Sequence, residues 1–507
     1  MIRCLNVTSI TFYGGVNEIG GNKFLLESGG TRIFLDFGKS YKREDEFFEF
    51  PLLQPSNVDD FFKISVIPEL EGLYRYHQYR AVYNDTGPIG VTPIEEKRRF
   101  DAILLTHAHM DHYGHVGLIR DDIPIYSSEI SKKIIELYYR TGRTNFNNTI
   151  SHLELIALEK KNIIEFANMS VERFDVDHSI LGASAYLIRG NKNIVYPGDF
   201  RLHGTRKDLT LNFLNEIQKE SVDYLLCEGT RLGSLEPNDE EDAELHIQSS
   251  DDDVKSKCIE LVQEEENLVI YDASQADLDR VKLIYEVAKK SGRQLVIDSK
   301  KAFLLLFLNE DQTLIEDLPE LENFKILLGR AKLGTNTRAC KDITNTCPGF
   351  YLESYKMGRR NHESELIKNI PEDCFIWGPH QRESLFNHSN EYIVYTSNGP
   401  LLLLQCRHKN WDMQGTYIYG KAEPFNEEME FSFNRLLNWL KLCNLKLEYA
   451  HTSGHCFPDD LAKVIEIINP TSLIPIHTEN PGKFRELIPR GTNIINVNLN
   501  QKLDLAN

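Results

Sequence analysis

The stretch THAHMDHYGH, residues 106–115, places four histidines and one aspartate within ten positions. It follows the apolar run FDAILL, residues 100–105, which has the length of a buried strand. A turn after such a strand can direct His107, His109, Asp111 and His112 toward one point or two neighbouring points. Imidazole and carboxylate groups together suit zinc, manganese or iron. The stretch therefore predicts a metal site at the end of a buried strand.

The composition is that of a large globular protein with an acidic surface. The chain has 507 residues, 41% of them hydrophobic and 26% charged, and a formal net charge of -19. Its length predicts about two to four domains. The acidic balance argues against a general nucleic-acid coat protein, which would be basic. It does not argue against a nuclease, because a local cationic groove or a bound metal can hold phosphate on an acidic body.

The cysteines and the apolar segments predict a cytosolic protein. None of the nine cysteines belongs to a C-x-x-C pair, and their number is odd, which favours free thiols over a disulfide framework. The opening residues, MIRCLNVTSITFYGG, have no signal-peptide core. No stretch of about 18 apolar residues is present, so no membrane span or membrane partner is expected.

Several other apolar runs also end in polar clusters. NIVY precedes PGDFR, VDYLL precedes CEGT and TSLIPI precedes HTE. Runs of this length predict buried strands, and α/β sheets usually hold their sites at strand ends. Residues 39–98 have weak periodicity and many aromatic residues, and we interpret them as a lid or an inserted element.

The acidic, apolar-poor segment 236–253 predicts a domain boundary. After it, NLVIYDAS, QADLDRVKLIYEVAKKSG and RQLVIDS have the pattern of a strand, a helix and a strand. We predict a first domain over 1–231, a second α/β domain over 232–425, and a return segment of the first domain over 426–507.

The H-x-H-x-D-H pattern of 107–112 resembles the signature of the metallo-β-lactamase fold, an αββα sandwich with metals at the edge of two sheets. DVDHSILGASAYLI (175–188) and IVYPGDFRLHG (194–204) are similar to its later motifs. LLCEGTRLG (225–233), HTSGHCFPDDL (451–461) and LIPIHTENPGKF (473–484) resemble motifs A, B and C of the β-CASP nucleases. GGVNEIGGN (14–22) is similar to the opening of ribonuclease J. The resemblance implies an αββα sandwich with a β-CASP domain inserted at 232–425.

The resemblance also implies two divalent metal ions, zinc or manganese. The implied ligands are His107, His109 and His178 for one ion, Asp111, His112 and His477 for the other, and Asp199 as the bridge between them.

Asp111 and Asp199 would thus take part in catalysis through the metals. His455 would contact the scissile phosphate or protonate the leaving oxygen, and Glu228 would orient His455. The residues implied to bind RNA phosphate are Ser274, Ser397, His451 and Ser453.

The function implied is a metal-dependent ribonuclease that degrades RNA from the 5′ end toward the 3′ end, has endonuclease activity and leaves 5′-phosphate products. RNA-acting members of the family resemble one another in having histidine at motif C, where DNA repair members commonly have valine. His477 therefore favours RNA, and single-stranded RNA in particular.

The chain also departs from the ribonuclease J pattern. Thr478 stands where glycine is usual, and Cys456 where alanine is usual. From the end of the sequence about thirty residues after His477, we expect the separate C-terminal domain of many ribonucleases J to be missing, which puts their mode of dimerisation in doubt. The sequence leaves open whether the protein forms a homodimer.

Two other functions remain open from sequence. A small-molecule hydrolase on the same fold, such as a thioesterase or lactonase, would share the first motifs, because fold alone does not decide function. Such enzymes lack the long α/β insertion and the S-G-H motif. A metal-free scaffold subunit is the third interpretation, although such subunits have usually lost ligands.

Overall fold

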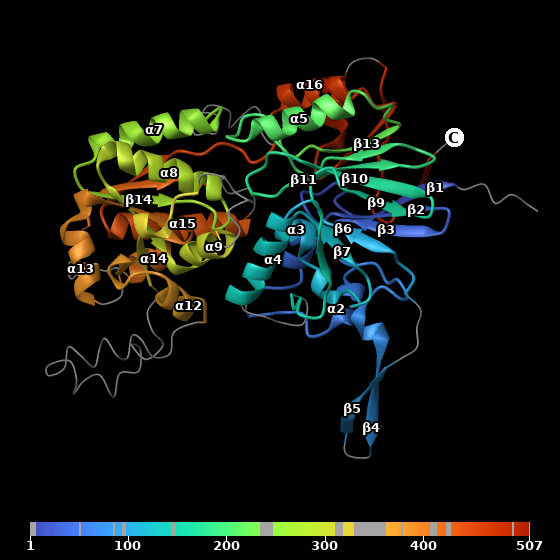
Figure 1. Ribbon diagram of the computed structural model, residues 1–507, viewed down its shortest axis with the longest axis horizontal. Coiled ribbons are helices and arrows are strands. Elements are labelled where there is room, and N and C mark those ends of the chain that lie inside the picture. The colour runs from blue at the N-terminus through green and yellow to red at the C-terminus, as the bar shows by residue number, and fades with distance from the viewer. Residues whose placement is uncertain are drawn as a thin grey trace, which may run out of the picture. The chain divides into compact units, whose positions relative to one another are not determined.

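The computed structural model describes residues 7–49, 52–84, 87–93, 98–142, 148–233, 247–309, 318–328, 361–376, 379–405, 413–421, 427–488 and 491–505. The chain divides into two compact units, and Figure 1 labels their helices and strands. The first unit comprises residues 1–237 and 454–507, and the second comprises 238–453.

The first unit contains two seven-stranded mixed sheets. In spatial order, the strands of one sheet are β23 (Lys502–Leu505), β1 (Thr8–Gly14), β2 (Lys23–Ser28), β3 (Thr31–Leu35), β6 (Ala102–Leu104), β7 (Ile125–Ser127) and β8 (Leu155–Ala157). Those of the other are β22 (Asn493–Ile494), β21 (Ser472–Ile476), β13 (Tyr224–Glu228), β12 (Ile194–Tyr196), β11 (Ser184–Arg189), β10 (Met169–Asp175) and β9 (Ile163–Phe166).

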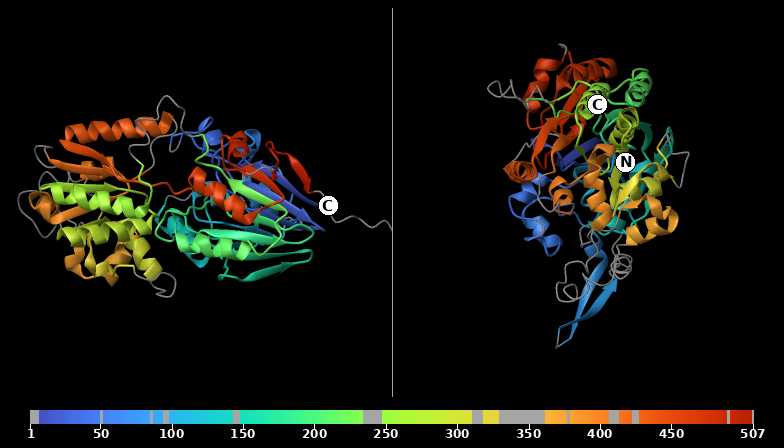
Figure 2. Two further views of the ribbon diagram at one scale, coloured as in Figure 1. Left: turned by 90° about the horizontal axis from the view of Figure 1, so that it is seen from above. Right: turned by 90° about the vertical axis from the view of Figure 1, so that its left-hand side faces the viewer.

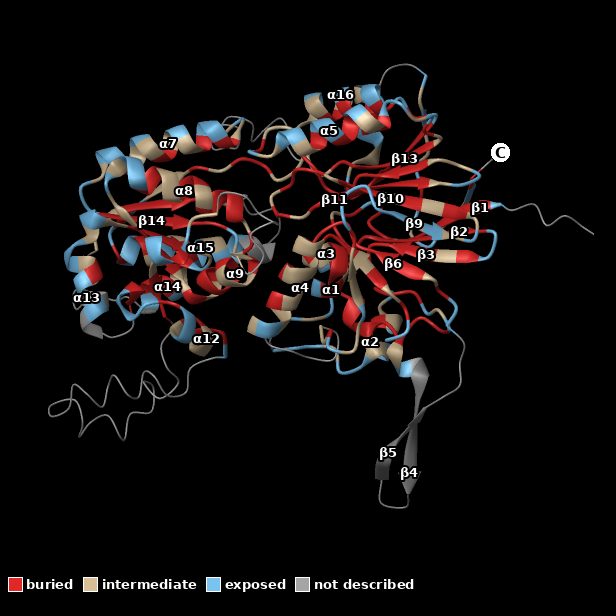
Figure 3. Cartoon of the chain, in the orientation of Figure 1, coloured by how far each residue is buried: buried red, intermediate tan, exposed pale blue. Residues whose placement is uncertain are grey.

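The two sheets pack face to face around one apolar core. Phe12, Phe24 and Leu104 from the first sheet belong to the same buried cluster as Tyr186 and Leu226 from the second. Because both faces of these strands are covered, they are apolar almost without interruption rather than alternating. Figure 3 shows this as strands coloured mostly for buried residues.

Helices cover the outer faces of the sandwich. On the second sheet, α5 (Lys207–Ile217) and α16 (Pro458–Ile468) contribute Phe213, Ile217, Val464 and Ile465 to a second buried cluster. The other helices of the unit are α1 (Tyr41–Asp45), α2 (Val58–Lys63), α3 (Met110–Tyr113), α4 (Glu129–Thr141) and α17 (Phe484–Leu487). The fold class predicted from sequence, an α/β protein with an αββα sandwich, is confirmed.

Residues 39–98 include α1, α2 and a hairpin of β4 (Tyr79–Asn84) and β5 (Gly87–Pro93). In Figure 1 the hairpin extends from the first unit as a two-stranded ribbon. The described part of the segment thus has secondary structure of its own, and its role as a lid or an inserted element stays a prediction.

The second unit contains one seven-stranded parallel sheet. Its strands, in spatial order, are β17 (Phe375–Ile376), β16 (Lys325–Leu327), β15 (Gln294–Asp298), β18 (Tyr392–Thr396), β14 (Leu268–Asp272), β19 (Gly415–Tyr419) and β20 (Leu445–Tyr449). Its helices are α7 (Asp251–Glu264), α8 (Leu278–Ser291), α9 (Ser299–Asn309), α12 (Asn361–Asn369), α13 (Pro379–Asn387), α14 (Gly399–Gln405) and α15 (Glu427–Leu442). They flank the sheet, as the two views of Figure 2 also show.

The sequence placed the end of the second domain at residue 425. In the structure the second unit continues to residue 453, and the chain then returns to the first unit. Both α15 and β20 belong to the second unit, and β20 pairs in parallel with β19 from Gly415 opposite Leu445 to Tyr419 opposite Tyr449. The boundary predicted at 231 lies next to residues 234–246, which are outside the described residues.

Two loops of the first unit meet where the metal motif begins. The backbone N–H groups of Phe37 and Lys39, after β3, donate to the carbonyls of His112 and Met110 in α3, at 2.8 Å each. Gly38 lies between them, and a Cβ atom there would come within 1.6 Å of the Asp111 carbonyl oxygen. The absence of a side chain at Gly38 therefore allows the loop to lie against α3.

We expect Gly38→Ala to displace α3 and to lower the free energy of unfolding by about 1–3 kcal/mol or more, since overpacking forces backbone shifts. Thermal unfolding measures the change in stability, and metal content measures the displacement of Asp111 and His112. Gly482→Ala is the matched control, because nothing lies within 4 Å of a Cβ atom at that position. Equal unfolding curves for both variants would contradict the prediction.

Candidate metal centre

A buried carboxylate, that of Asp36, fixes the turn that carries the metal motif. Asp36 follows β3 and accepts hydrogen bonds from the backbone N–H of Thr106 at 2.7 Å and from its hydroxyl at 2.8 Å. The hydroxyl of Tyr196, at the end of β12 in the other sheet, donates to Asp36 at 2.6 Å. The carbonyl of Thr106 in turn accepts from the N–H of Ser184 at 2.9 Å. The turn after β6 is thus held by both sheets.

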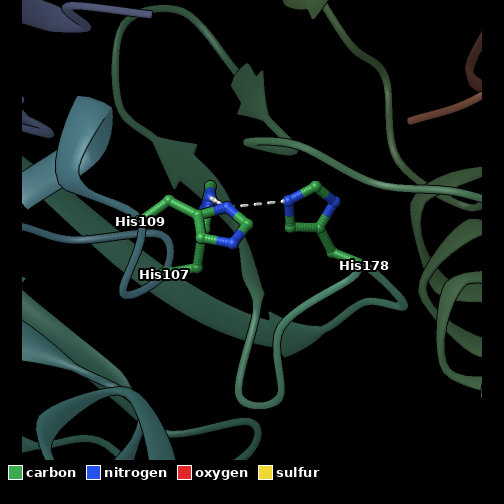
Figure 4. A group of neighbouring side chains, drawn as sticks. All are labelled: His107, His109 and His178. Atoms are coloured by element: carbon green, nitrogen blue, oxygen red, sulfur yellow. Dashed lines mark hydrogen bonds between the residues drawn. The ribbon is translucent and has the colours of Figure 1, made fainter. Parts of the chain in front are cut away.

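Three histidines form the first group of donor atoms. Figure 4 shows His107, His109 and His178 with their rings turned toward one another. Nε2 of His107 lies 3.0 Å from Nδ1 of His109, and Nε2 of His178 lies 3.1 Å from the same atom. Nδ1 of His178 lies 2.6 Å from the carbonyl of Gly454 and must donate to it. In the neutral ring this leaves the lone pair of Nε2 directed into the group.

The second group contains Asp111, His112, Asp199 and His477, whose donor atoms all lie within 4.8 Å of one another. Nδ1 of His112 donates to Asp36 at 2.7 Å, which directs Nε2 toward Asp199, 3.1 Å away. Nε2 of His477 lies 3.1 Å from Oδ2 of Asp111. His477 has a φ of 49°, which is uncommon for a non-glycine residue and is often found at functional sites.

One carboxylate oxygen stands between the two groups. Oδ2 of Asp199 lies 3.1 Å from Nε2 of His112, 3.6 Å from that of His477, 3.8 Å from that of His107 and 3.9 Å from that of His178. The arrangement suits a carboxylate that bridges two cations.

Glu228 and His455 form a pair beside these groups. Nδ1 of His455 lies 3.1 Å and 3.2 Å from the two carboxylate oxygens of Glu228. Glu228, at the end of β13, is buried and also accepts from the hydroxyl of Thr230 at 2.7 Å. That hydroxyl lies 2.8 Å from Nδ1 of His477 and can accept a hydrogen bond from it, because the hydroxyl proton is donated to Glu228. Glu228 therefore orients two histidines, one directly and one through Thr230.

The first group is neutral in the metal-free protein. Burial lowers the pKa of His109 to about 4, although Asp111 and Asp199 partly oppose the effect. Burial, followed by the neighbouring imidazoles, also holds the pKa values of His107 and His178 well below the usual value. Neutral imidazole is the form that binds metals, so these rings need not lose a proton first.

The second group, in contrast, contains charged residues in the metal-free protein. Burial lowers the pKa of His112, but the carboxylates of Asp199, Asp111 and Asp36 outweigh it and raise that pKa well above its usual value. Burial raises the pKa of Asp199, but His477 and His112 outweigh burial and lower it well below the usual range. In the metal-free protein, the proton on His112 balances charge that a divalent cation would otherwise balance.

The chemistry of the donors fits two metal ions. Imidazole nitrogens alone make up the first group, and imidazoles with carboxylates make up the second, as zinc and manganese sites require. The partners of His112 and His178 fix which ring nitrogen carries the proton, as is common around metal ligands. The structure thus brings all seven predicted ligands together in two groups, and it does not identify the metal.

His115, the fourth histidine of the opening stretch, faces away from these groups. It is fully buried, and its Nε2 lies 2.9 Å from Oε1 of Glu44, which also pairs with Lys39 at 3.3 Å. The residue stabilises the loop after β3 rather than joining either group of donors.

The four residues implied to bind phosphate lie in the second unit. Ser274 is exposed just after β14, and the hydroxyl of Ser397, just after β18, donates to the side-chain oxygen of Gln275 at 2.7 Å. Nδ1 of His451, after β20, lies 3.2 Å from the carbonyl of Gly420. Ser453 is buried.

Sequence patterns missed Asp36, Tyr196 and Thr230. Each is an ordinary residue near a strand end, and its role depends on partners far away in the chain. The sequence TRIFLDFG did contain one signal for Asp36. In it an apolar strand is followed by an aspartate, just as the apolar runs NIVY and VDYLL are followed by Asp199 and Glu228.

We expect Glu228→Gln to lower the pKa of His455 in the metal-free protein. Burial lowers this pKa, but the charge of Glu228, then that of Asp199, and the hydrogen bond to Glu228 raise it to about 9. Without the Glu228 charge, the imidazolium should lose its proton at a lower pH. An NMR titration of the histidine ring protons measures the shift, with Glu216→Gln, at a residue paired with Lys161 and Lys219, as control. A pKa of His455 unchanged by Glu228→Gln would contradict the role given to this pair.

No protein-family model matches the chain. Among curated proteins, ribonuclease J of Pyrococcus abyssi is 25% identical over 507 residues, which cover 95% of this chain and 91% of that protein. Ribonuclease J of Mycoplasma pneumoniae is 22% identical, covering 93% of this chain and 68% of that protein. Ribonuclease J 2 of Streptococcus pyogenes is 26% identical over 297 residues, which cover 57% of this chain and only 45% of that protein.

A solved structure has the same fold over nearly the whole chain. It is a protein of unknown function from Enterococcus faecalis V583, with a TM-score of 0.70 and 23% sequence identity, covering 98% of this chain and 100% of that one. No described helix is long and apolar enough to span a membrane. Together with the geometry above, these comparisons show that the chain is a distant homologue of ribonuclease J, with a donor set suited to a binuclear metal site.

Proposed function

We propose that this protein is a metal-dependent ribonuclease that hydrolyses single-stranded RNA, mainly from the 5′ end, and leaves 5′-phosphate products. The observation that carries the proposal is the position of Asp199, whose Oδ2 lies within 3.9 Å of imidazoles from both donor groups. The distant relation to ribonuclease J over most of the chain supports the choice of RNA.

The residues of the two groups would hold zinc or manganese. His107, His109 and His178 would bind one ion, and Asp111, His112 and His477 the other, with Asp199 shared between them. When bound, two such ions lower the pKa of a water molecule and neutralise charge on the phosphate.

His455 would protonate the leaving 3′ oxygen. Glu228 raises the pKa of His455 against the effect of burial and accepts the Nδ1 proton. The Nε2 proton is then the one available for transfer. General acid catalysis of this kind typically contributes about 10²–10⁴-fold to the rate. When water attacks the phosphorus, the bond from phosphorus to the 3′ oxygen breaks, that oxygen takes the proton from His455, and the phosphate stays on the 5′ oxygen of the downstream nucleotide.

The second unit would supply a pocket for the 5′-phosphate. Ser274, Ser397 and His451 follow β14, β18 and β20, which are parallel strands, so all three lie at the same edge of the sheet. Lys421, after β19, lies at this edge too, and its Nζ donates to the carbonyl of Ser397 at 2.8 Å. Polar groups at the carboxyl ends of parallel strands are the usual place for ligands in α/β sheets. We include Ser453, which follows His451 closely, in this proposed pocket.

We expect Asp199→Asn to lower the rate of RNA cleavage by more than about a hundredfold. This exceeds the loss of about 10–100-fold that is typical when a residue that only hydrogen-bonds to a metal ligand is changed. An amide cannot bridge two cations, so the metal content should fall as well. Digestion of end-labelled RNA measures activity, and elemental analysis measures metal. The control is Asp122→Asn, which removes a carboxylate paired with Arg120 outside both donor groups.

Near-normal turnover by a pure, folded Asp199→Asn protein would contradict the two-metal model. A wild-type protein that binds metal and hydrolyses a thioester or lactone, but not RNA, would instead show the small-molecule hydrolase. A wild-type protein that binds no metal would favour the scaffold subunit.

We expect faster degradation of RNA with a 5′-monophosphate than with a 5′-triphosphate or a 5′-hydroxyl, with release of mononucleotides. A pocket of hydrogen-bond donors fits the two charges of a monophosphate, whereas a hydroxyl end brings no charge to these donors. Ser274→Ala should reduce the ratio of the degradation rate for 5′-monophosphate RNA to the rates for the other two ends. Ser256→Ala, on the exposed face of α7, is the control and should leave this ratio unchanged. Equal rates for all three ends, with internal fragments first, would show an endonuclease without this pocket.

A further inference from the structure

A pocket lined by tyrosines lies beside the metal centre in the first unit. Its volume is about 420 Å³, within the range of sites for small organic ligands. Two of its lining residues, His109 and Asp111, belong to the donor groups described above. The aromatic lining residues are Tyr41, Tyr113, Tyr138 and Tyr139.

The tyrosines come from three helices that meet at this place. Tyr41 begins α1 and is 43% exposed, whereas Tyr113 ends α3 and is buried. Tyr138 and Tyr139 are half-buried in the last part of α4, before Gly142 ends the helix. All of them line the same pocket. A tyrosine hydroxyl is both a donor and an acceptor of hydrogen bonds.

The described lining residues are mostly aromatic and apolar. No lysine or arginine is among the described residues that line the pocket, and the carboxylate of Asp111 would repel an anion. Ile135 and Ile150 add apolar surface to the aromatic rings. Aromatic walls with hydroxyls at their edges favour a flat, uncharged ring that has polar groups on its rim. A nucleobase is such a ring, and stacking on tyrosine tolerates any base.

We propose that this pocket binds the nucleobase of a nucleotide next to the scissile phosphate. The inference rests on the proposed ribonuclease function and extends it, because the pocket shares His109 and Asp111 with the metal centre. A phosphate held at the metals would bring the base of an adjoining nucleotide to the tyrosines. Tyr138 and Tyr139 would therefore position the substrate by contacting this base.

The experiment uses the full-length, metal-loaded protein and a set of single-stranded hexaribonucleotides. Each oligonucleotide lacks the base at one position and keeps the ribose and phosphate. For the wild type, we expect base loss at one position relative to the cleaved bond to raise KM by about tenfold, the size expected for losing one stacked base. The value of kcat should change much less, since the metal centre is unaltered.

Variants at Tyr138 connect this effect to the pocket. Tyr138→Leu keeps apolar volume but removes the ring, so it should raise KM for the intact RNA and abolish most of the further penalty for base loss. Tyr138→Phe keeps the ring and should restore the penalty. Tyr126→Leu, at a half-buried tyrosine of β7 outside the pocket, is the matched control. Tyr139→Leu gives a second test if Tyr138→Leu does not fold.

The outcomes separate the pocket from the proposed function. The same base-loss penalty in the wild type and in both leucine variants would overturn the pocket, while RNA cleavage itself would stand. A wild-type protein that loads its metals but cleaves none of the RNAs would overturn the ribonuclease proposal and this inference with it. A penalty abolished by leucine and restored by phenylalanine supports the inference.

Discussion

The metal centre depends on one buried carboxylate, that of Asp36. It accepts hydrogen bonds from the backbone and hydroxyl of Thr106, from Nδ1 of His112 and from the hydroxyl of Tyr196. These contacts join β3, the turn after β6 and the end of β12, so one side chain holds both sheets and orients His112, a residue of the second donor group. Removing one partner of a buried charged pair typically costs about 3–5 kcal/mol, because the other charge is left unpaired. The orientation of His112, and through it the approach of Asp199, follows from this constraint.

The remaining ligands are oriented by similar partners at a distance in sequence. Gly454 accepts from His178, and Thr230 and Glu228 together direct His477. In the metal-free protein, the proton on His112 balances part of the negative charge of the carboxylates in the second group. Ligand orientation is therefore a property of the folded sandwich, and the short H-x-H-x-D-H stretch supplies only part of it.

The sequence predicted the fold class well, because the sandwich is built from short apolar strands that end in recognisable polar motifs. The ligands near one another in the chain, from His107 to His112, could be singled out from their spacing alone. His178, Asp199 and His477 required the resemblance to a family, since nothing local distinguishes them from ordinary polar residues. Asp36, the burial of His115 against Glu44 and the tyrosine pocket were not predicted, because each depends on contacts between segments far apart in sequence. The late return of the chain was missed because α15 and β20 have no compositional break before them.

The division of the first unit into two stretches of sequence has a consequence for biosynthesis. The histidines of the first group end at residue 178, whereas His477 follows the whole of the second unit, and β23 pairs with β1 only after that. At a translation rate of about 5–20 residues per second, the ribosome needs tens of seconds to pass from one to the other. A nascent chain thus contains the three imidazoles of the first group well before His477 completes the second. Only a chain translated through both units contains the full set of donor atoms.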